Sequence, residues 1–345
     1  MSWKSQAVAF ALLAVATSLA GQQRQLARGQ ESTPERLFPV ADPEGHGFID
    51  RQGRLVIPLH YKHAQQFAEG LAPVIVESGV CGYIDQAGLE VIKPRFKYCR
   101  LFSDGIAPVD VEGGSTFIDR SGRPISATVF EEVGHFAGDR GPVRVDTRWG
   151  FIDRVGRWAI VPQFRYASGD RRGRALVKLA DDDRCVVIDA VGDVLRRLPG
   201  PDCRGPVDGV MVVGGPASGY AYIRPDGTFL VPFKYEWAEP FVDGLAAVRV
   251  DGRTSFIAAD GQVAIPLTFD GDASALCNRE FSEGLIPVMI RGKCGYIDRT
   301  GRVVIPPRFS IARGFHDGLA YVCLDTRCGY VDRQGRAVWL SKPFR

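Results

Sequence analysis

The sequence lacks both a strong charge imbalance and the short motifs that mark common enzymes. Its 43 lysine and arginine residues nearly balance 40 acidic residues, which leaves a formal charge of +3 over 345 residues. A near-neutral chain with evenly spread charge does not predict binding to nucleic acid or to an anionic membrane surface. There is no nucleophile elbow, phosphate loop, dinucleotide fingerprint or metalloprotease helix motif. The sequence therefore indicates none of the enzyme classes that use these motifs.

Metal-binding patterns are also scarce. A zinc site requires paired Cys-x-x-Cys motifs or interleaved histidines, and the 8 cysteines and 5 histidines form neither. The nearest histidine cluster is His60-Tyr61-Lys62-His63, which lies in an expected connector and has no evident third ligand, so exposed loop histidines are the simpler interpretation. The acidic run Asp181-Asp182-Asp183 lies between two expected strands and is typical of an exposed hairpin tip. We expect neither a metal nor a cofactor.

One glycine recurs through the chain at a nearly constant interval. It follows an aromatic-Ile-Asp triplet, or a variant of it, at Gly53, Gly88, Gly122, Gly156, Gly192, Gly227, Gly261, Gly301 and Gly335. Successive positions are 35, 34, 34, 36, 35, 34, 40 and 34 residues apart. A period of about 35 residues repeated about nine times predicts a repeat architecture.

Each unit contains three short apolar runs separated by turns. In the second unit they are 70–76, 82–85 and 89–92, and Pro94 ends the third run. The Asp-x-x-Gly sequence between the second and third runs is typical of a type I turn, which favours this interpretation over a calcium site with one carboxylate per turn. Proline belongs at a strand end or a sheet edge. The unit therefore predicts a three-stranded antiparallel meander followed by a connector of about ten residues.

The connector carries a phenylalanine before an acidic-Gly pair. It recurs at Phe67, Phe102, Phe241, Phe281 and Phe315. An aromatic at one phase of successive units predicts packing into a core shared by neighbours, with a ligand-stacking ladder as the alternative.

An arginine follows the turn aspartate in several units, at Arg51, Arg120, Arg154, Arg299 and Arg333. A solvated charge at a turn tip is the simple interpretation. If stacking aligned these tips, they would form a cationic stripe able to hold an acidic glycan or a carboxylate-rich partner.

The N-terminus reads as an export signal. Lys4 supplies the positive region, 7–15 an apolar region, and Ser18-Leu19-Ala20 the small residues before a cleavage site expected after Ala20. The apolar run is short for a membrane span, although an uncleaved anchor is the alternative. We expect residues 1–20 to be a signal peptide, 21–36 a flexible linker and 37–345 the repeat array.

Two regions depart from the pattern. The fifth unit replaces the aromatic and acidic-Gly signals with Asp170-Arg171-Arg172-Gly173, so a bend or junction is expected near 166–206. The step of 40 residues places an insertion around 270–279, which we expect to be a longer surface loop.

Eight cysteines in an exported chain predict disulfides, and the repeat phase predicts their partners. Cys81 and Cys185 each lie seven residues before their turn glycine. Cys99 and Cys203 each lie eleven residues after the same glycines. Because the two pairs occupy the same positions in the repeat, their cysteines should have the same spatial relation. Each bond is expected to cross-link residues within one unit and to stabilise the fold by a few kcal/mol at most. The expected pairs are Cys81–Cys99, Cys185–Cys203, Cys277–Cys294 and Cys323–Cys328. Cys277 lies on the inserted loop, and Cys323–Cys328 is expected to cross a tight hairpin.

The repeated motif resembles the WG repeat of bacterial proteins. The likeness is carried by Trp149-Gly150-Phe151-Ile152-Asp153, by Cys294-Gly295-Tyr296-Ile297-Asp298 and by Phe281-Ser282-Glu283-Gly284-Leu285, and it covers nearly all of 37–345. Only Trp149 retains the signature tryptophan, and cysteine replaces it in several units. The resemblance implies an all-β repeat protein and supplies no catalytic residues.

We expect an all-β tandem array of about nine units. An open, solenoid-like stack is favoured over closure into a β-propeller, because propellers usually have four to eight blades and the chain begins and ends on whole units. Stacked repeats create extended surfaces. We therefore expect a non-catalytic binding or scaffold protein of the bacterial envelope or exterior, periplasmic or secreted, with a protein or envelope glycan as partner.

The alternative is a hydrolase or lyase that acts on an envelope polymer, with its site assembled across repeats or in the fifth unit. Two close carboxylates with shifted pKa values in a cleft would favour this enzyme. A long uniform groove of aromatic or arginine side chains would favour binding.

Overall fold

The structure is a computed structural model that describes residues 36–343, apart from 170–172, 206–208, 271–276 and 278–280. The expected signal peptide, its cleavage site after Ala20 and nearly all of the expected linker lie outside the described residues. The described residues contain strands and no helix, as the repeat pattern predicts. Accordingly, none of their elements is a helix capable of crossing a membrane.

The described residues form nine small antiparallel sheets, which we number in chain order. Sheets 1 to 4 consist of β1 (Phe38–Asp42), β2 (Gly45–Ile49) and β3 (Leu55–Tyr61); β4 (His63–Ala64), β5 (Ala72–Ile75), β6 (Cys81–Ile84) and β7 (Glu90–Phe96); β8 (Tyr98–Cys99), β9 (Ile106–Val111) and β10 (Gly114–Asp119); and β11 (Glu132–Val133), β12 (Arg140–Val145), β13 (Arg148–Asp153) and β14 (Trp158–Phe164).

The other five sheets follow the same order. They consist of β15 (Tyr166–Gly169), β16 (Ala175–Lys178), β17 (Val186–Ile188) and β18 (Val194–Arg197); β19 (Asp202–Arg204), β20 (Met211–Gly215), β21 (Gly219–Ile223) and β22 (Phe229–Tyr235); β23 (Trp237–Ala238), β24 (Leu245–Val250), β25 (Arg253–Ala258) and β26 (Val263–Asp270); β27 (Leu285–Ile290), β28 (Lys293–Asp298) and β29 (Val303–Phe309); and β30 (Ile311–His316), β31 (Leu319–Leu324), β32 (Arg327–Val331) and β33 (Ala337–Leu340).

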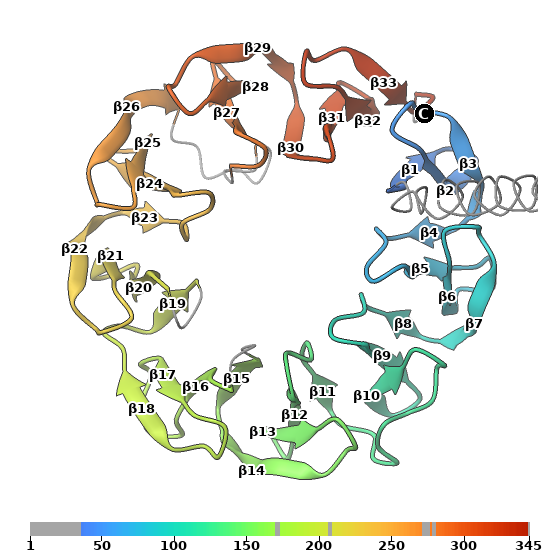
Figure 1. Cartoon of the computed structure of the whole chain (residues 1–345), viewed down its shortest axis with the longest axis vertical. Helices are drawn as coiled ribbons and strands as arrows, with labels where there is room; N and C mark the ends of the chain where they lie inside the picture. The colour runs from blue at the N-terminus through green and yellow to red at the C-terminus, as the bar shows by residue number, and fades with distance from the viewer. Residues whose placement is uncertain (1–35, 170–172, 206–208, 271–276, 278–280, 344–345) are drawn as a thin grey trace, which may run out of the picture. The chain divides into compact units, whose positions relative to one another are not determined.

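Most sheets have a fourth strand that the repeat pattern did not predict. The connector expected to be a loop contributes a short strand to the next sheet, as β4 does beside β5. The backbone amides of Lys62 and Gln65 donate to carbonyls of that sheet at 2.8 and 3.0 Å. A backbone that passes beside an open strand edge pairs its polar groups there, because unpaired buried groups are costly. The unit is therefore mostly a four-stranded meander, with its extra strand on the inner side of the ring (Figure 1).

The Asp-x-x-Gly turns are confirmed. In the turn between β2 and β3, the amide of Gly53 donates to the carbonyl of Asp50 at 3.0 Å, and the Asp50 carboxylate accepts the amides of Gln52 and Arg54 at 2.9 Å each. Gly53 has a φ of 82°, a left-handed conformation that glycine adopts without steric cost.

The second glycine of the repeat motif has a different role, which is close approach between strands. A Cβ atom added to Gly82 would lie 2.3 Å from the carbonyl oxygen of Ile92. The register between β6 and β7 shifts on both sides of Tyr83, which indicates a β-bulge. The bulge brings the backbone of the outermost strand onto this residue, so only glycine fits.

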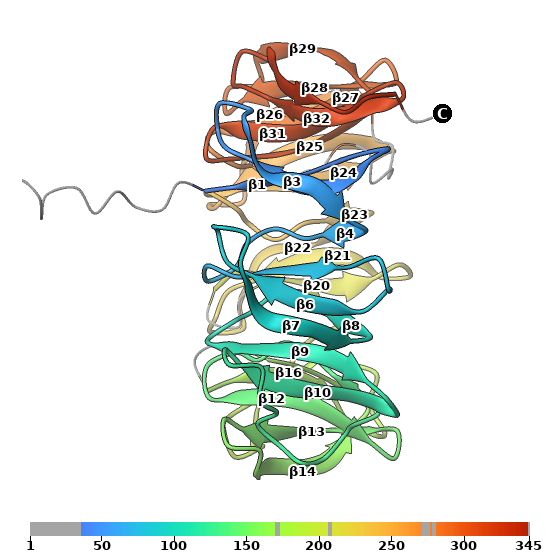
Figure 2. The ribbon, with the colours of Figure 1, turned by 90° about the vertical axis from the view of Figure 1, so that its right-hand side faces the viewer.

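The expectation of an open stack is wrong, because the sheets close into a nine-bladed β-propeller (Figure 1). The core of the described residues consists of nine buried clusters, and each cluster joins two neighbouring sheets. One cluster joins sheet 1 to sheet 9 through Phe38, Val40, Ile49, Leu319 and Tyr330. Figure 2 shows the strands of successive sheets running roughly along the axis of the ring.

The ring closes by side-chain contacts between its first and last sheets. The rings of Phe38 and Tyr330 lie 5.3 Å apart, and the Tyr330 hydroxyl donates to the carbonyl of Pro39 at 3.1 Å. The Nε of Arg51 donates to the carbonyl of Asp317 at 2.6 Å. We call this interface the seam. Whole units at both ends of the chain argued against a ring, but neighbouring sheets meet face to face, so closure does not require a shared strand.

The irregular fifth unit forms sheet 5 and part of sheet 6 within the same ring. The described residues from Leu37 onward belong to one compact unit. The predicted insertion around 270–279 lies largely outside the described residues. Cys277 is described, and its backbone forms an isolated parallel β-bridge with Ala312 of β30.

Four disulfides join the cysteine pairs that the repeat phase predicts: Cys81–Cys99, Cys185–Cys203, Cys277–Cys294 and Cys323–Cys328. Their expected placement within one unit is wrong for the first two. Cys99 and Cys203 lie on the added first strands, so these bonds join sheets 2 and 3 and sheets 5 and 6. The third bond holds Cys277 in the core between sheets 8 and 9. Every third interface of the ring thus contains a disulfide.

Candidate functional site

The five arginines that follow turn aspartates hold neighbouring sheets together. Each reaches the acidic-Gly turn of the preceding sheet in the ring. The contacts are Arg51 to the carbonyl of Asp317, Arg120 to the carboxylate of Glu69, Arg154 to the carbonyl of Asp104, Arg299 to the carboxylate of Asp243, and Arg333 to both the carboxylate and the backbone carbonyl of Glu283. The five arginines thus make equivalent contacts at successive interfaces of the ring. Each guanidinium is paired with an acidic side chain or a backbone carbonyl of the neighbouring sheet, which argues against a stripe of unpaired cations.

The acidic residues of these turns complete the connection. The carboxylate of Asp104 accepts the amide of Gly138 in the next sheet at 3.0 Å, and Glu69 accepts the amide of Gly105 at the same distance. A carboxylate that accepts a backbone amide makes a strong, charge-assisted hydrogen bond. These surfaces are therefore structural contacts between sheets.

The phenylalanines that precede the acidic-Gly pairs lie in the shared core, as predicted. Each packs against an aromatic residue of the preceding sheet at centroid distances of 4.8 to 5.5 Å. Phe102, Phe281 and Phe315 are almost fully buried. The ligand-stacking ladder is therefore wrong for these residues.

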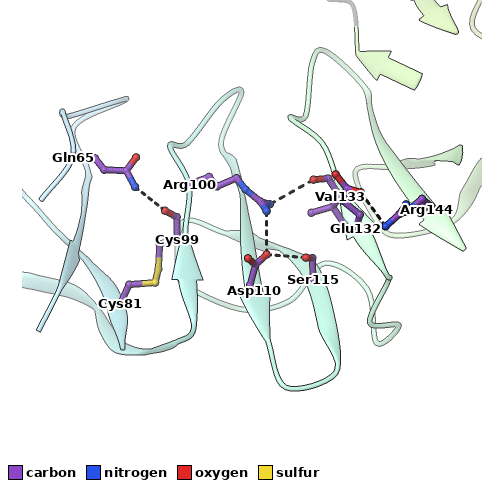
Figure 3. Close-up of polar contacts among 9 residues, drawn as sticks. All are labelled: Gln65, Cys81, Cys99, Arg100, Asp110, Ser115, Glu132, Val133 and Arg144. Atoms are coloured by element: carbon purple, nitrogen blue, oxygen red, sulfur yellow. Dashed lines mark hydrogen bonds and ion pairs between the residues drawn. A yellow bond between two sulfur atoms is a disulfide. The ribbon is translucent and has the colours of Figure 1, made fainter. Parts of the chain in front are cut away.

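The inner strands are linked by polar side chains that reach from one sheet to the next (Figure 3). Gln65 donates to the carbonyl of Cys99 at 3.1 Å. Arg100 donates to the carbonyl of Val133 at 3.5 Å and to the Asp110 carboxylate at 3.1 Å. The inner side of sheets 2 to 4 is thus occupied by internal contacts. A different arrangement occurs on sheets 5 to 7.

A pocket of about 460 Å³ lies on the inner strands of sheets 5 to 7. Its size is within the range of about 300–1,000 Å³ that is usual for small-molecule sites. The lining residues are Tyr166, Lys178, Cys185, Pro201, Asp202, Cys203, Arg204, Tyr220 and Trp237. They combine large aromatic surfaces with both signs of charge, which suits the binding of a partly polar ligand.

Arg204 is the central charged group of the pocket. Its guanidinium carbon lies 5.2 Å from the centre of the Tyr220 ring and 5.8 Å from the Trp237 ring, within cation–π distance of both. The side chain is 34% exposed, and its nearest carboxylate oxygen, on Glu239, is 3.8 Å away. The aromatic rings therefore orient the guanidinium while part of it stays open to solvent.

Tyr220 fixes the one carboxylate that lines the described part of the pocket. Its hydroxyl donates to Asp202 at 2.9 Å. Burial, followed by the hydrogen bond to Asp202, raises the pKa of Tyr220 above its ordinary value. The phenol therefore keeps its proton, and the Asp202 carboxylate is held in place as an acceptor.

The disulfide Cys185–Cys203 forms part of the pocket wall and connects β19 to sheet 5. Tyr166 and Lys178 face each other in register across β15 and β16. The Tyr166 side chain is 49% exposed, so its ring is accessible. The pocket is therefore built on covalently fixed strands and presents an open aromatic surface at one side.

The histidine cluster does not assemble a metal site in the described residues. His63 packs against His46 at 4.9 Å and His60 packs against Tyr61 at 4.0 Å. Burial and the neighbouring His63 lower the pKa of His46. Within the described ranges, no group of three or more metal-ligating side chains occurs. Both predicted histidines also lie in strands and not in a loop.

The acidic run Asp181-Asp182-Asp183 lies in the hairpin between β16 and β17, as predicted. Asp182 accepts hydrogen bonds from Arg184 at 2.9 Å and from Arg197 at 2.8 Å, and these contacts lower its pKa. Asp183 pairs with Arg165. Arginines thus pair with two of the three aspartates, which argues against a cation site.

The sequence contained a signal for the pocket that its local motifs did not reveal. Tyr166, Asp202 and Trp237 are 36 and 35 residues apart, so they occupy one phase of the repeat. Each is the first residue of an innermost strand. The predicted three-stranded unit has no such strand, so the sequence pattern alone does not place these residues side by side.

The fold and the pocket define a class of protein: a closed β-propeller built from sequence repeats, with a ligand-sized pocket on its inner strands. The sequence matches the family model described as the WG containing repeat at residues 47–78, 82–114, 116–146, 149–181, 220–253 and 295–326. These segments cover more than half of the chain. The protein therefore belongs to the WG repeat family. No curated protein matches the sequence.

The chain is similar to solved structures at low sequence identity. The crystal structure of the eukaryotic initiation factor is similar with a TM-score of 0.62 and 8% identity, over 90% of this chain and 96% of that chain. The crystal structure of BamB from Moraxella catarrhalis has a TM-score of 0.49 and 12% identity, over 87% and 98% of the two chains. Identities this low reflect the fold alone.

Proposed function

We propose that the protein is a non-catalytic binding module of the cell envelope or exterior, which holds a glycan or protein partner at the pocket on sheets 5 to 7. The pocket carries this proposal, because accessible aromatic and charged side chains converge there on rigid strands. Binding pockets characteristically combine apolar walls with a few polar groups that fix orientation.

Four disulfides support a location outside the reducing cytoplasm. Disulfides persist in the periplasm and in secreted proteins, and each of the eight cysteines is paired. The N-terminal sequence, with cleavage expected after Ala20, supports the same location.

The hydrolase or lyase alternative finds no support in the pocket. A glycosidase of the usual kind requires two carboxylates flanking the bond. Asp202 is the one carboxylate lining the described part of the pocket, and the Tyr220 hydroxyl engages it. A binding role therefore accounts better for the arrangement.

Capture from envelope extracts tests the proposal. Mature protein is compared with Trp237→Ala in the pocket and with Trp158→Ala, whose ring is 45% exposed on the outermost strand of sheet 4. We expect the partner to be retained by the wild type and by Trp158→Ala, and to be lost by Trp237→Ala. Equal retention by both variants would refute the site. Release of a cleaved product during incubation would refute the non-catalytic role.

A further inference from the structure

We infer that the pocket on sheets 5 to 7 takes an acidic saccharide, with sugar rings against Tyr166 and Trp237 and a sugar carboxylate on Arg204 and Lys178. This inference rests on the proposed binding function and specifies its ligand class. On the inner side of sheets 2 to 4, Gln65 and Arg100 link neighbouring sheets, whereas these four side chains line one open volume.

The charge balance of the pocket favours an anionic ligand. Two cations, Lys178 and Arg204, line it against one lining carboxylate, Asp202, so the lining side chains carry a net positive charge. The distance of 3.8 Å from Arg204 to Glu239 is long compared with the 2.7–2.9 Å of a charge-assisted hydrogen bond. Among the described residues, no carboxylate forms an ion pair with Lys178. Both cations therefore retain capacity for a ligand carboxylate.

The geometry of Arg204 suits a carboxylate in particular. A guanidinium presents N–H donors in a planar fork that matches the two oxygens of a carboxylate. The rings of Tyr220 and Trp237 restrict the orientation of this fork before a ligand arrives. A group that is already oriented loses less conformational entropy on binding.

The aromatic surfaces favour a sugar as the carrier of that carboxylate. A pyranose ring has an apolar C–H face and a rim of hydroxyl groups, so it packs its face on an aromatic ring while its rim forms hydrogen bonds. Tyr166 offers a half-exposed ring, and Trp237 is partly buried at the far side of the pocket. Asp202 lies between them in the order of the inner strands and offers acceptor oxygens to the sugar hydroxyls.

A peptide is less well suited to this site. Extended peptides commonly bind by adding a strand to an exposed sheet edge, with main-chain hydrogen bonds providing affinity. The innermost strands here are short, because β19 contains three residues and β23 contains two. Side chains therefore dominate recognition, which favours a ligand without a peptide backbone.

A glycan array tests the ligand class with mature, disulfide-bonded protein. The array carries uronate- and sialate-containing oligosaccharides, each beside its carboxyl-reduced counterpart. We expect binding to acidic members and at least about tenfold weaker binding to the reduced counterparts, because hydrogen bonds to charged groups are lost. Affinity should fall as salt concentration rises.

Charge variants then locate the contact. Arg204→Gln and Lys178→Gln should each weaken binding of the captured acidic oligosaccharide by about tenfold to hundredfold. Lys93→Gln, on the exposed face of β7, is the matched control and should bind as the wild type does. Lys178 is at the end of β16 and its side chain is not part of the buried core, so its variant reports on binding even if Arg204→Gln folds poorly.

The outcomes separate this inference from the proposed function. Equal binding to acidic and reduced members, lost in Trp237→Ala, would overturn the acidic class and keep the binding role. Capture of a protein through Trp237 without any glycan binding would also overturn the acidic saccharide and keep the binding role. Absence of every Trp237-dependent interaction would overturn both.

Discussion

Replacing Tyr330 with phenylalanine tests whether the ring is closed in solution. The variant removes the hydroxyl that donates to Pro39 across the seam at 3.1 Å and keeps the ring that packs on Phe38 at 5.3 Å. An intramolecular hydrogen bond contributes about 0.5–1.5 kcal/mol to the free energy of unfolding. The matched control is Tyr296→Phe, which removes the equivalent bond to the carbonyl of Arg313 between sheets 8 and 9, 2.8 Å long.

Chemical denaturation with intact disulfides measures both effects. We expect the two variants to lose similar free energies of unfolding, about 1 kcal/mol each, and to show similar small decreases in Tm. Tyr330→Ala, which also removes the packed ring, should lose about 3–5 kcal/mol, as large aromatic truncations do. A loss in Tyr296→Phe together with wild-type stability in Tyr330→Phe would show that sheets 1 and 9 do not meet, and would refute closure.

Two further predictions concern the disulfides and the turns. Replacing both Cys81 and Cys99 with serine should lower the free energy of unfolding by about 3 kcal/mol, because the disulfide closes a loop of 18 residues. Unchanged stability of this variant would contradict the prediction. Peptide mapping of the wild type under non-reducing conditions that found other cysteine pairs would also contradict it. Acid should destabilise the protein through turn aspartates such as Asp153 and Asp189, whose pKa values are lowered chiefly by hydrogen bonds from backbone amides. A lowered pKa in the folded state contributes stability above the unfolded value of about 3.9, and that stability is lost as the pH falls further. Tm should therefore decrease as the pH is lowered below about 4, and the decrease should be less steep in Asp153→Asn. If the dependence of Tm on pH were the same in that variant as in the wild type, Asp153 would not contribute to the acid sensitivity.

The features that the sequence predicted correctly are those encoded within one repeat. The Asp50 turn and the phase of Cys81 and Cys99 depend on residues close in sequence, and the repeat supplies the same geometry many times. Phe102 was placed correctly in a core for the same reason, since its phase relative to the strands fixes which side it faces.

The features that were missed depend on distant residues. Closure of the ring depends on the angle between neighbouring sheets. That angle arises from packing at every interface, so no local sequence motif predicts it. The role of Arg333 was missed because its partner Glu283 belongs to another unit, 50 residues earlier. The pocket required knowing that Tyr166 and Trp237 begin neighbouring inner strands.

The spacing of the disulfides has a mechanical consequence for ligand binding. Disulfides tie sheet 2 to sheet 3 and sheet 5 to sheet 6, and a third disulfide fixes Cys277 to sheet 8 within the core between sheets 8 and 9. Sheets 1, 4 and 7 remain attached by packing and hydrogen bonds. The pocket extends from the tied pair 5 and 6 to Trp237 of sheet 7. A bound molecule would therefore form a reversible cross-link between sheets 6 and 7, whose interface contains none of the four disulfides.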